Sequence, residues 1–379
     1  MNRKGISRRD FLKVSGVGVM GLAGVAGLRA MAQPTVTIPE PAAPMLHGSD
    51  HYMGGPGVAG KVDHAANGFD PAGLLTDFDY GEVTEENGRT VRQWEILAMD
   101  KEIEVAPGVY FPAWAYGSST SAESKRAGHI VGRVPGPTFR CVEGELLRYR
   151  FINAGSHPHT IHFHGIHPAT MDGVPGIGVG LVYPGATATY EFTAAPFGCH
   201  LYHCHANPLK KHIHKGLYGA FIIDPDPEKY SGREQEIARS RNHRYEENKA
   251  VHEMVMVMNA FDTNFDGENE IYAVNSVAFA YMTDPITAKR DTLQRLYLVN
   301  LTEFDLINSF HLHANMFHYY DHGTTFEPTL RTVDTIVQCQ GQRGILEFSF
   351  KDFLPGLYMF HAHQSEFAEL GWMGFFGVS

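Results

Sequence analysis

Residues 198–205 read Gly-Cys-His-Leu-Tyr-His-Cys-His, and residues 356–363 read Gly-Leu-Tyr-Met-Phe-His-Ala-His. Each stretch ends in a His-X-His pair. In a strand, residues i and i+2 point to the same side, so both histidines of a pair can face one ligand while the residue between them faces away. In the first stretch that residue is Cys204. The two stretches predict related strands that both present paired imidazoles, with a thiol behind the first pair only.

The second half of the chain repeats the first around these stretches. The offset between matching segments runs from 147 residues (149 to 296) to 158 residues (198 to 356). Short strand candidates recur in both halves, and 40 glycines and 21 prolines supply many turns. An internal repeat of this kind predicts an all-β chain of two Greek-key barrel or sandwich domains. The expected parts are an irregular arm (33–80), a first domain (81–223), a charged, helix-permissive linker (224–250) and a second domain (251–379).

The N-terminus has the features of an export signal. Ser7-Arg8-Arg9-Asp10-Phe11-Leu12-Lys13 is a twin-arginine motif, followed by an apolar, glycine-rich stretch and by Ala30-Met31-Ala32 as a cleavage site. We therefore expect residues 1–32 to be a signal peptide and the protein to be periplasmic or secreted. The apolar stretch is too short and too rich in glycine for a membrane span. The net charge of −11 argues against a nucleic-acid partner.

An exported protein can form disulfides, but the chain has only four cysteines, at positions 141, 199, 204 and 339. If Cys204 binds a metal, at most one intrachain bridge remains possible. A Cys141–Cys199 bridge is conceivable, and the sequence does not establish it.

Eight histidines form four His-X-His pairs, and imidazole is a ligand for copper, zinc, iron and nickel. They lie in His-Thr-Ile-His-Phe-His-Gly (159–165), Tyr-His-Cys-His (202–205), Ser-Phe-His-Leu-His (309–313) and Phe-His-Ala-His (360–363). These four segments resemble the copper motifs of multicopper oxidases. Two domains rather than three make the chain similar to the two-domain, laccase-like branch, which also resembles copper nitrite reductase in architecture. The resemblance implies two cupredoxin-like domains.

The resemblance also implies four coppers per subunit. A trinuclear cluster would take one type 2 copper and a type 3 pair, and a type 1 copper would lie in domain 1. The type 2 ligands would be His162 and His311. The type 3 ligands would be His164, His203, His205, His313, His361 and His363. The type 1 site would use His159, Cys204 and His212, with Leu217 at the axial position and His214 as a rival to His212.

Domain 2 departs from the type 1 pattern at each matching position. Asn308 stands in place of the first histidine, Ala362 in place of the cysteine, and Phe367 in place of the last histidine. Trp372 follows Gly371 where leucine or methionine would be. We therefore expect a type 1 copper in domain 1 only.

By the same resemblance, the cluster would form between domain 1 of one subunit and domain 2 of the next, in a homotrimer. A small electron donor would reduce the type 1 site, and electrons would pass through Cys204 to His203 and His205, where dioxygen becomes water. Asp172 matches an acidic residue near the type 2 copper and is a candidate proton relay, with Glu366 as a weaker one.

Three rival functions remain. A metal-ion oxidase would take electrons from Cu(I) or Mn(II), although no long methionine-rich insert supports it. A copper nitrite reductase would have its catalytic aspartate three residues after His159, where this chain has His162. An electron-transfer or copper-storage protein would show no turnover, and the four histidine pairs argue against it.

Overall fold

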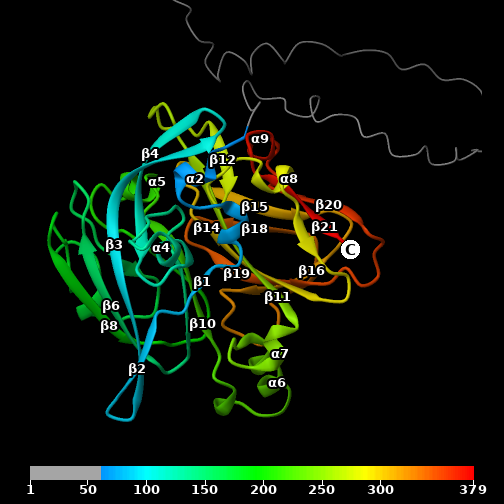
Figure 1. Cartoon of the computed structure of the whole chain (residues 1–379). Coiled ribbons are helices and arrows are strands. Elements are labelled where there is room, and N and C mark those ends of the chain that lie inside the picture. The colour runs from blue at the N-terminus through cyan, green and yellow to red at the C-terminus, as the bar shows by residue number, and fades with distance from the viewer. Residues whose placement is uncertain (1–60) are drawn as a thin grey trace, which may run out of the picture. The chain divides into compact units, whose positions relative to one another are not determined.

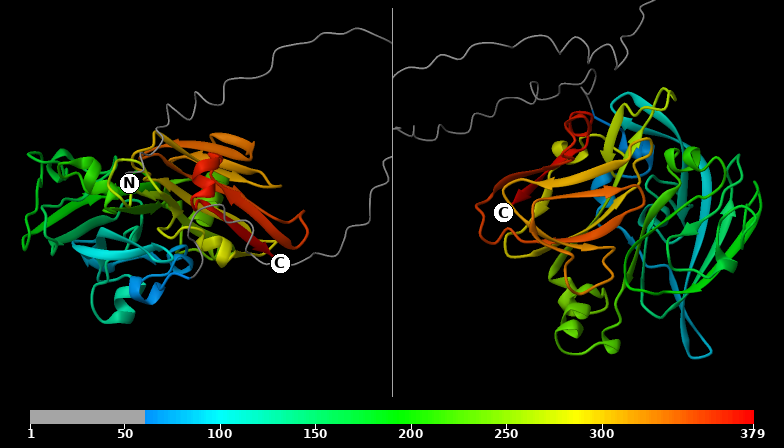
Figure 2. Two further views of the ribbon diagram at one scale, coloured as in Figure 1. Left: turned by 90° about the horizontal axis from the view of Figure 1, so that it is seen from above. Right: turned by 180° about the vertical axis from the view of Figure 1, so that it is seen from behind.

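The computed structural model describes residues 61–379, so the predicted signal peptide and the arm up to residue 60 lie outside the described residues. The described chain consists of two β-sandwiches, drawn from blue to green and from yellow to red (Figures 1 and 2). The predicted all-β fold of two cupredoxin-like domains is confirmed. None of the described helices is long and apolar enough to span a membrane.

Domain 1 has two five-stranded sheets. The first has the order β1-β5-β10-β9-β7 and contains both histidine-pair strands of this domain. Its strands are β1 (Phe78–Asp79), β5 (Thr138–Val142), β7 (His162–Phe163), β9 (Gly198–His203) and β10 (Tyr218–Asp224). The second sheet has the order β2-β3-β6-β8, and β4 also pairs with β3. Its strands are β2 (Glu82–Glu86), β3 (Arg89–Ala106), β4 (Val109–Ser118), β6 (Leu146–Asn153) and β8 (Thr187–Thr193).

Domain 2 repeats this plan. One sheet contains β11 (Val251–Phe261), β12 (Ile271–Val274), β14 (Leu293–Asn300), β16 (Phe317–Asp321), β17 (Leu330–Val333) and β19 (Arg343–Phe348). The other contains β13 (Ile286–Ala288), β15 (Ile307–Leu312), β18 (Thr335–Cys339), β20 (Gly356–His361) and β21 (Met373–Val378). The histidine strands pair alike in the two domains, because His162 lies opposite His203 and His311 lies opposite His361.

The helices are short, and all except α2 and α3, which precede β1, lie between strands. They are α2 (His64–Asn67), α3 (Pro71–Leu74), α4 (Ala122–Ala127), η2 (Ala169–Met171), α5 (Leu209–His214), η3 (Pro227–Lys229), α6 (Gly232–Arg241), α7 (Glu246–Lys249), α8 (Ala280–Thr283) and α9 (Ser365–Glu369). The predicted linker therefore carries η3, α6 and α7.

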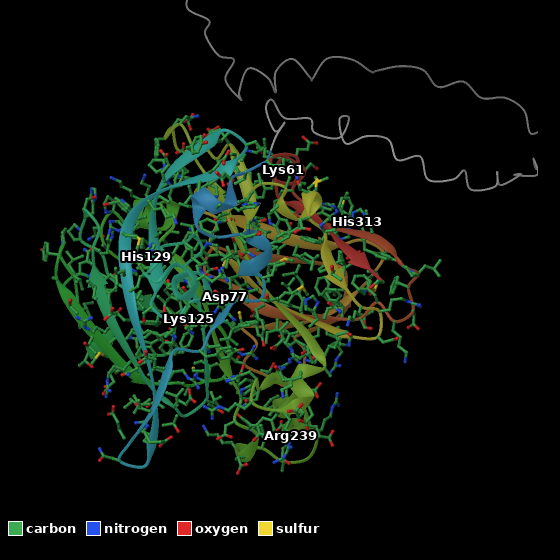
Figure 3. The ribbon with its side chains drawn as sticks, viewed as in Figure 1. Lys61, Asp77, Lys125, His129, Arg239 and His313 are labelled. Atoms are coloured by element: carbon green, nitrogen blue, oxygen red, sulfur yellow. The ribbon has the colours of Figure 1, made fainter. Side chains whose placement is uncertain are left out.

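The prediction of an irregular arm is wrong for residues 61–80. This segment forms α2, α3 and β1, and β1 extends a sheet of domain 1 by pairing in parallel with β5. Asp63 and Asp70 cap the two helices through their carboxylates. Asp77, labelled in Figure 3, forms an ion pair of 2.5 Å with the buried Arg133. Elements of two to four residues are too short to show a hydrophobic period, which is why the sequence pattern did not reveal them.

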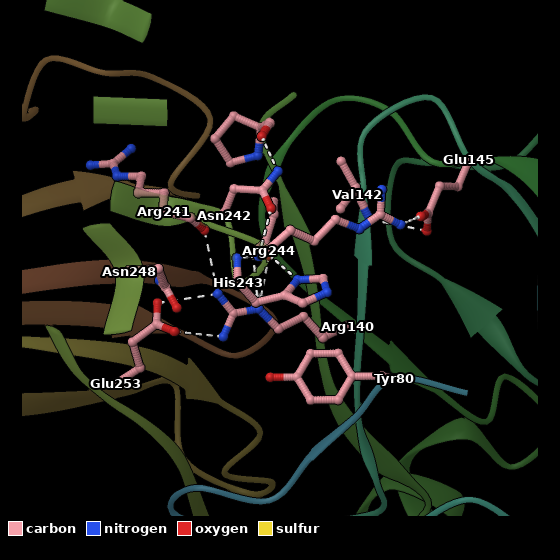
Figure 4. A network of polar contacts seen from close by, with 12 residues as sticks. Tyr80, Arg140, Val142, Glu145, Arg241, Asn242, His243, Arg244, Asn248 and Glu253 are labelled. Carbon is pink, nitrogen blue, oxygen red and sulfur yellow. Dashed lines mark hydrogen bonds and ion pairs between the residues drawn. The ribbon is translucent and has the colours of Figure 1, made fainter. Parts of the chain in front are cut away.

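A buried network of charges joins the two domains (Figure 4). Arg140 of β5 donates to Asp224 at 3.0 Å and to Glu253 of β11 at 2.6 Å. Arg295 donates to the same Glu253 at 3.1 Å. Burial alone would raise the pKa of Glu253, but Arg140 and Arg295 lower it to about 2. The carboxylate therefore stays ionised between two guanidinium groups.

We expect Arg140→Ala to destabilise the protein by about 3–5 kcal/mol, because it leaves two buried carboxylates without this cation. Urea unfolding monitored by circular dichroism measures the loss. Arg150→Ala is the matched control, since its ion pair with Glu95 is exposed and contributes about 0–1 kcal/mol. Equal losses from the two variants would contradict the assigned role of the buried network.

Candidate metal centres

Two imidazoles and one thiol converge in the interior of domain 1. The Cys204 Sγ atom lies 3.2 Å from Nδ1 of His212 and 4.0 Å from Nδ1 of His159. The two Nδ1 atoms lie 3.3 Å apart, and all three side chains are buried. Two imidazole nitrogens and a sulfur directed at one point form the donor set of a blue copper site.

The local fold brings these three residues together. His159 pairs with Val182 in an isolated bridge, Cys204 directly follows β9, and His212 lies in α5. The Cys204 amide donates to the Leu217 carbonyl at 2.9 Å, which fixes the segment after α5 beside the thiol. The Thr160 amide donates to the Cys204 sulfur at 3.3 Å.

The protonation states suit metal binding. Burial lowers the pKa of His159 to about 3 and that of His212 to about 4, so each imidazole is neutral at neutral pH and has a lone pair for a metal. Burial also raises the pKa of the Cys204 thiol. Metal binding there must therefore displace a proton.

His214 lies apart from this group. Its Nε2 atom accepts the Asp262 amide at 3.0 Å, and its ring packs against Phe111 and Phe304. This geometry favours His212 over His214 as the second imidazole ligand. Leu217 is fully buried and has no donor atom in its side chain, so it would not ligate a metal held by this group.

A second group of histidines lies on the far side of the Cys204 strand. The Nε2 atoms of His164 and His203 are 2.8 Å apart. The ring of His162 lies 5.4 Å from that of His203 and 5.3 Å from that of His205. Burial lowers the pKa of His164 to about 2 and that of His203 to about 3, so both can act as neutral ligands.

Domain 2 presents the matching group. The Nε2 atoms of His313 and His361 are 3.0 Å apart. The ring of His311 lies 5.3 Å from that of His361 and 5.2 Å from that of His363. In the described chain, no hydrogen bond or ring contact joins a histidine of one group to a histidine of the other. One chain therefore provides two separate half-sites of four histidines each.

Hydrogen bonds fix several of these rings with Nε2 directed inward. The Nδ1 atom of His203 contacts the Cys204 carbonyl at 2.9 Å, and that of His361 contacts the Ala362 carbonyl at 2.6 Å. The amide of His205 donates to Thr160 Oγ1, and the amide of His363 donates to Ser309 Oγ, each at 2.8 Å. Such second contacts orient metal-ligating histidines, and here they are repeated in both domains.

The position in domain 2 that matches the group of His159, Cys204 and His212 is filled by other contacts. Asn308 donates to Thr302 at 2.8 Å, and Phe367 stacks on Tyr272 at 4.0 Å. Ala362 and Trp372 are buried. These side chains replace the thiol and both imidazoles by an amide and apolar groups, which leaves no comparable donor set.

The two acidic candidates are placed differently. Asp172 contacts the Nδ1 atom of His162 at 2.9 Å. His167, which sequence analysis missed, packs its ring 5.1 Å from that of His162 and lies 4.0 Å from the Asp172 carboxylate. In the sequence, the only indication of a role for His167 was its position five residues after His162, in a loop. Glu366 lies exposed on α9.

All four cysteines are free. Cys141 lies opposite Ile223 and Cys199 lies opposite Ile222, so strand β10 separates the two sulfurs. The conceivable bridge between Cys141 and Cys199 is therefore absent.

Comparisons with known proteins agree with this geometry. Two family models described as Multicopper oxidase match residues 114–228 and 248–379. A solved structure described as the crystal structure of a multicopper oxidase is 50% identical, covers 84% of this chain and 100% of its own, and has a TM-score of 0.72.

Two curated relatives show lower coverage of their own length. A probable nitrite reductase-hydroxylamine oxidoreductase fusion protein of Kuenenia stuttgartiensis is 26% identical over 75% of this chain and 31% of its own length. Copper resistance protein A of Escherichia coli is 36% identical over 29% of this chain and 18% of its own length. The chain thus spans less than a third of these two relatives. Together, the two family models and the 50% identical structure show that the chain belongs to the multicopper oxidase family, whose members are copper-dependent oxidoreductases.

Proposed function

We propose that this protein is a laccase-type oxidase that couples one-electron oxidation of phenol-like or other small reductants to the reduction of dioxygen to water. The observation that carries the proposal is the order His203-Cys204-His205, in which His203 ends β9 and the other two residues follow it directly. Cys204 belongs to the buried thiol–imidazole group, and its two neighbours belong to a histidine half-site. Bound copper would supply the one-electron redox chemistry at both places.

The chain's own residues hold the thiol–imidazole group and the histidine half-site of domain 1 at a fixed separation. The backbone of residues 203–205 gives a covalent path between them. The Thr160 hydroxyl donates to the Cys204 sulfur at 3.9 Å and accepts from the His205 amide. We propose type 1 ligation by His159, Cys204 and His212. We also propose that the eight paired histidines hold the trinuclear cluster, which gives about four coppers per subunit.

The assembly follows from the separate half-sites. A half-site of four histidines in each domain needs a partner half-site, and the described chain does not bring its own two together. We propose that domain 1 of one subunit meets domain 2 of the next in a homotrimer, since head-to-tail contacts that close form a ring. Oxygen uptake with a simple phenol, measured on the copper-loaded protein, tests the oxidase function.

A nitrite reductase is the rival suggested by some relatives. The proposed oxidase requires His162 as a ligand, and His162 stands at the position where the resemblance would place that enzyme's catalytic aspartate. Measured with the same electron donor, nitrite consumption without oxygen uptake would favour the rival.

We expect Asp172→Asn to lower oxygen turnover by about 10–100-fold, because Asp172 orients His162 and is our candidate to hold a proton at its carboxylate. Turnover and its pH profile are measured together, because a merely structural change would leave the profile unshifted. Glu366→Gln, the weaker candidate, serves as the comparison. An unchanged turnover and pH profile in Asp172→Asn would remove it as a relay.

Leu217→Met should lower the reduction potential of the blue copper, because a thioether adds an axial donor where leucine has none. Potentiometric titration of the blue absorption measures the shift. A rise in potential, or no change, would show that Leu217 does not cover the axial side.

A further inference from the structure

A cavity of about 950 Å³ opens beside the group of His159, Cys204 and His212. Its walls come from β3 and the middle of β4, from the loop after β6, and from α5 with the residues on either side of it. Two loops of domain 2, between β11 and β12 and between β14 and β15, complete it. Both domains therefore contribute to it. Apart from His214, which was considered as a rival ligand, the residues of this cavity were not among the site residues predicted from the sequence.

Trp114 separates the cavity from the proposed type 1 ligands. It lines the cavity, and its ring centroid lies 4.8 Å from that of His212 and 5.1 Å from that of His159. The side chain is almost fully buried, at 4% exposure. The ring of His157, which also lines the cavity, lies 4.6 Å from that of Trp114. A molecule bound against these two rings is thus separated from the His212 and His159 imidazoles by the indole of Trp114.

Three lysines of α5 and the residue after it form a cationic wall around this tryptophan. The Nζ atom of Lys211 lies 5.2 Å from the Trp114 ring, and that of Lys215 lies 5.8 Å from it. Lys210 places its Nζ atom 4.2 Å from the ring of Phe304. Within residues 61–379, none of these ammonium groups forms an ion pair with a carboxylate. Lys215 donates to the Pro112 carbonyl, which leaves Lys210 and Lys211 as the candidates to contact a ligand. Ammonium groups that form no ion pair and lie beside aromatic rings are suited to an aromatic anion.

The carboxylates that line the same cavity are used in local hydrogen bonds. Asp100 accepts from the amide and hydroxyl of Ser156, Asp262 accepts from two loop amides, and Asp266 accepts from one. Glu102 is exposed at the rim. Lys101 directs its ammonium group away, to the Gly132 carbonyl. The acidic side chains thus organise the backbone of the walls, while the lysine side chains remain without anionic partners.

We propose that this cavity binds the electron donor and selects an aromatic molecule that carries a fixed anionic group, such as a carboxylate or a sulfonate. The ring rests on Trp114, and the anion faces Lys210 and Lys211. This inference rests on the proposed oxidase function and deepens it by naming the class of donor. Each phenolic or amine donor gives up one electron and one proton, so four donors and one dioxygen yield four oxidised radicals and two waters.

Calorimetric titration of the copper-loaded protein with 2-naphthalenesulfonate tests binding without turnover. The uncharged 2-naphthalenesulfonamide is the matched probe, and we expect the sulfonate to bind about tenfold more tightly. The double variant Lys210→Gln/Lys211→Gln should weaken sulfonate binding by about tenfold and leave the sulfonamide unchanged. Trp114→Leu should weaken both probes. The control is Lys125→Gln, an exposed lysine on α4 that does not line the cavity (Figure 3).

Equal affinity of the two probes for the unmodified protein would overturn the inference, as would an unchanged sulfonate affinity in the double lysine variant. If Mn(II) displaces the sulfonate from the cavity, the result would instead point to a metal-ion donor held by the acidic side chains. The blue absorption of each variant shows whether the neighbouring copper ligands are intact.

Kinetics separate this inference from the function on which it rests. If oxygen uptake shows the same KM for a neutral phenol and for its carboxylate analogue, the oxidase function stands and the anion preference fails. If no phenol supports oxygen uptake, the oxidase function fails, while calorimetry still reports whether the cavity binds aromatic anions.

Discussion

Cys204→Ser should remove the blue absorption of the copper-loaded protein and reduce oxygen uptake to the background of free copper. The thiol is the only sulfur in the buried donor group of His159, Cys204 and His212, and a serine oxygen does not replace a thiolate ligand. The variant also removes the sulfur that would link the copper to the covalent path toward His203 and His205. Visible spectroscopy and an oxygen electrode measure the two losses on the same sample.

Cys339→Ser is the matched control, because this cysteine is free and exposed on β18. We expect the control to keep both the blue absorption and the oxygen uptake. A blue band that survives in Cys204→Ser would show that the copper thiolate lies elsewhere.

Two inactive variants should restore activity when they are assembled together. His162→Ala/His164→Ala removes ligands from the domain 1 half-site, and His311→Ala/His361→Ala removes ligands from the domain 2 half-site. Each variant alone has no intact cluster. In mixed rings, an intact cluster forms where domain 1 of the second variant meets domain 2 of the first. Random mixing should therefore restore about a quarter of the unmodified oxygen uptake.

The experiment requires co-expression of the two variants, or dissociation and reassembly, with analytical ultracentrifugation to report the oligomer. The two variants mixed without exchange of subunits are the control and should stay inactive. No recovery in mixed rings would mean that each cluster forms within one chain, which would contradict the proposed contact between subunits.

The grouping of the histidines within each domain could be predicted from the sequence because the relevant period is local. The i, i+2 spacing places His203 and His205 on one side of the Cys204 strand, and the internal repeat supplies the matching strand with His361 and His363. The paired strands then meet in equivalent register in both domains. Loss of the second thiol–imidazole group was also visible, because Ala362 stands where the first domain has Cys204.

The parts that the sequence did not predict depend on contacts between distant residues. Trp114 lies about a hundred positions before His212 in the chain, and only the folded structure brings the two rings into contact. Arg140 meets Glu253 across the domain boundary in the same way. His167 lies in an irregular loop with no period to mark it. Residues 61–80 form elements too short for a pattern to reveal.

The most direct measurement is the copper content per subunit of copper-loaded protein, with electron paramagnetic resonance and the visible spectrum recorded on the same sample. We predict about four coppers per subunit, with one blue thiolate signal and one type 2 signal. About two coppers per subunit, one of each kind, would contradict the trinuclear cluster and favour nitrite reduction. About five, with two blue centres, would show that domain 2 holds a type 1 copper after all.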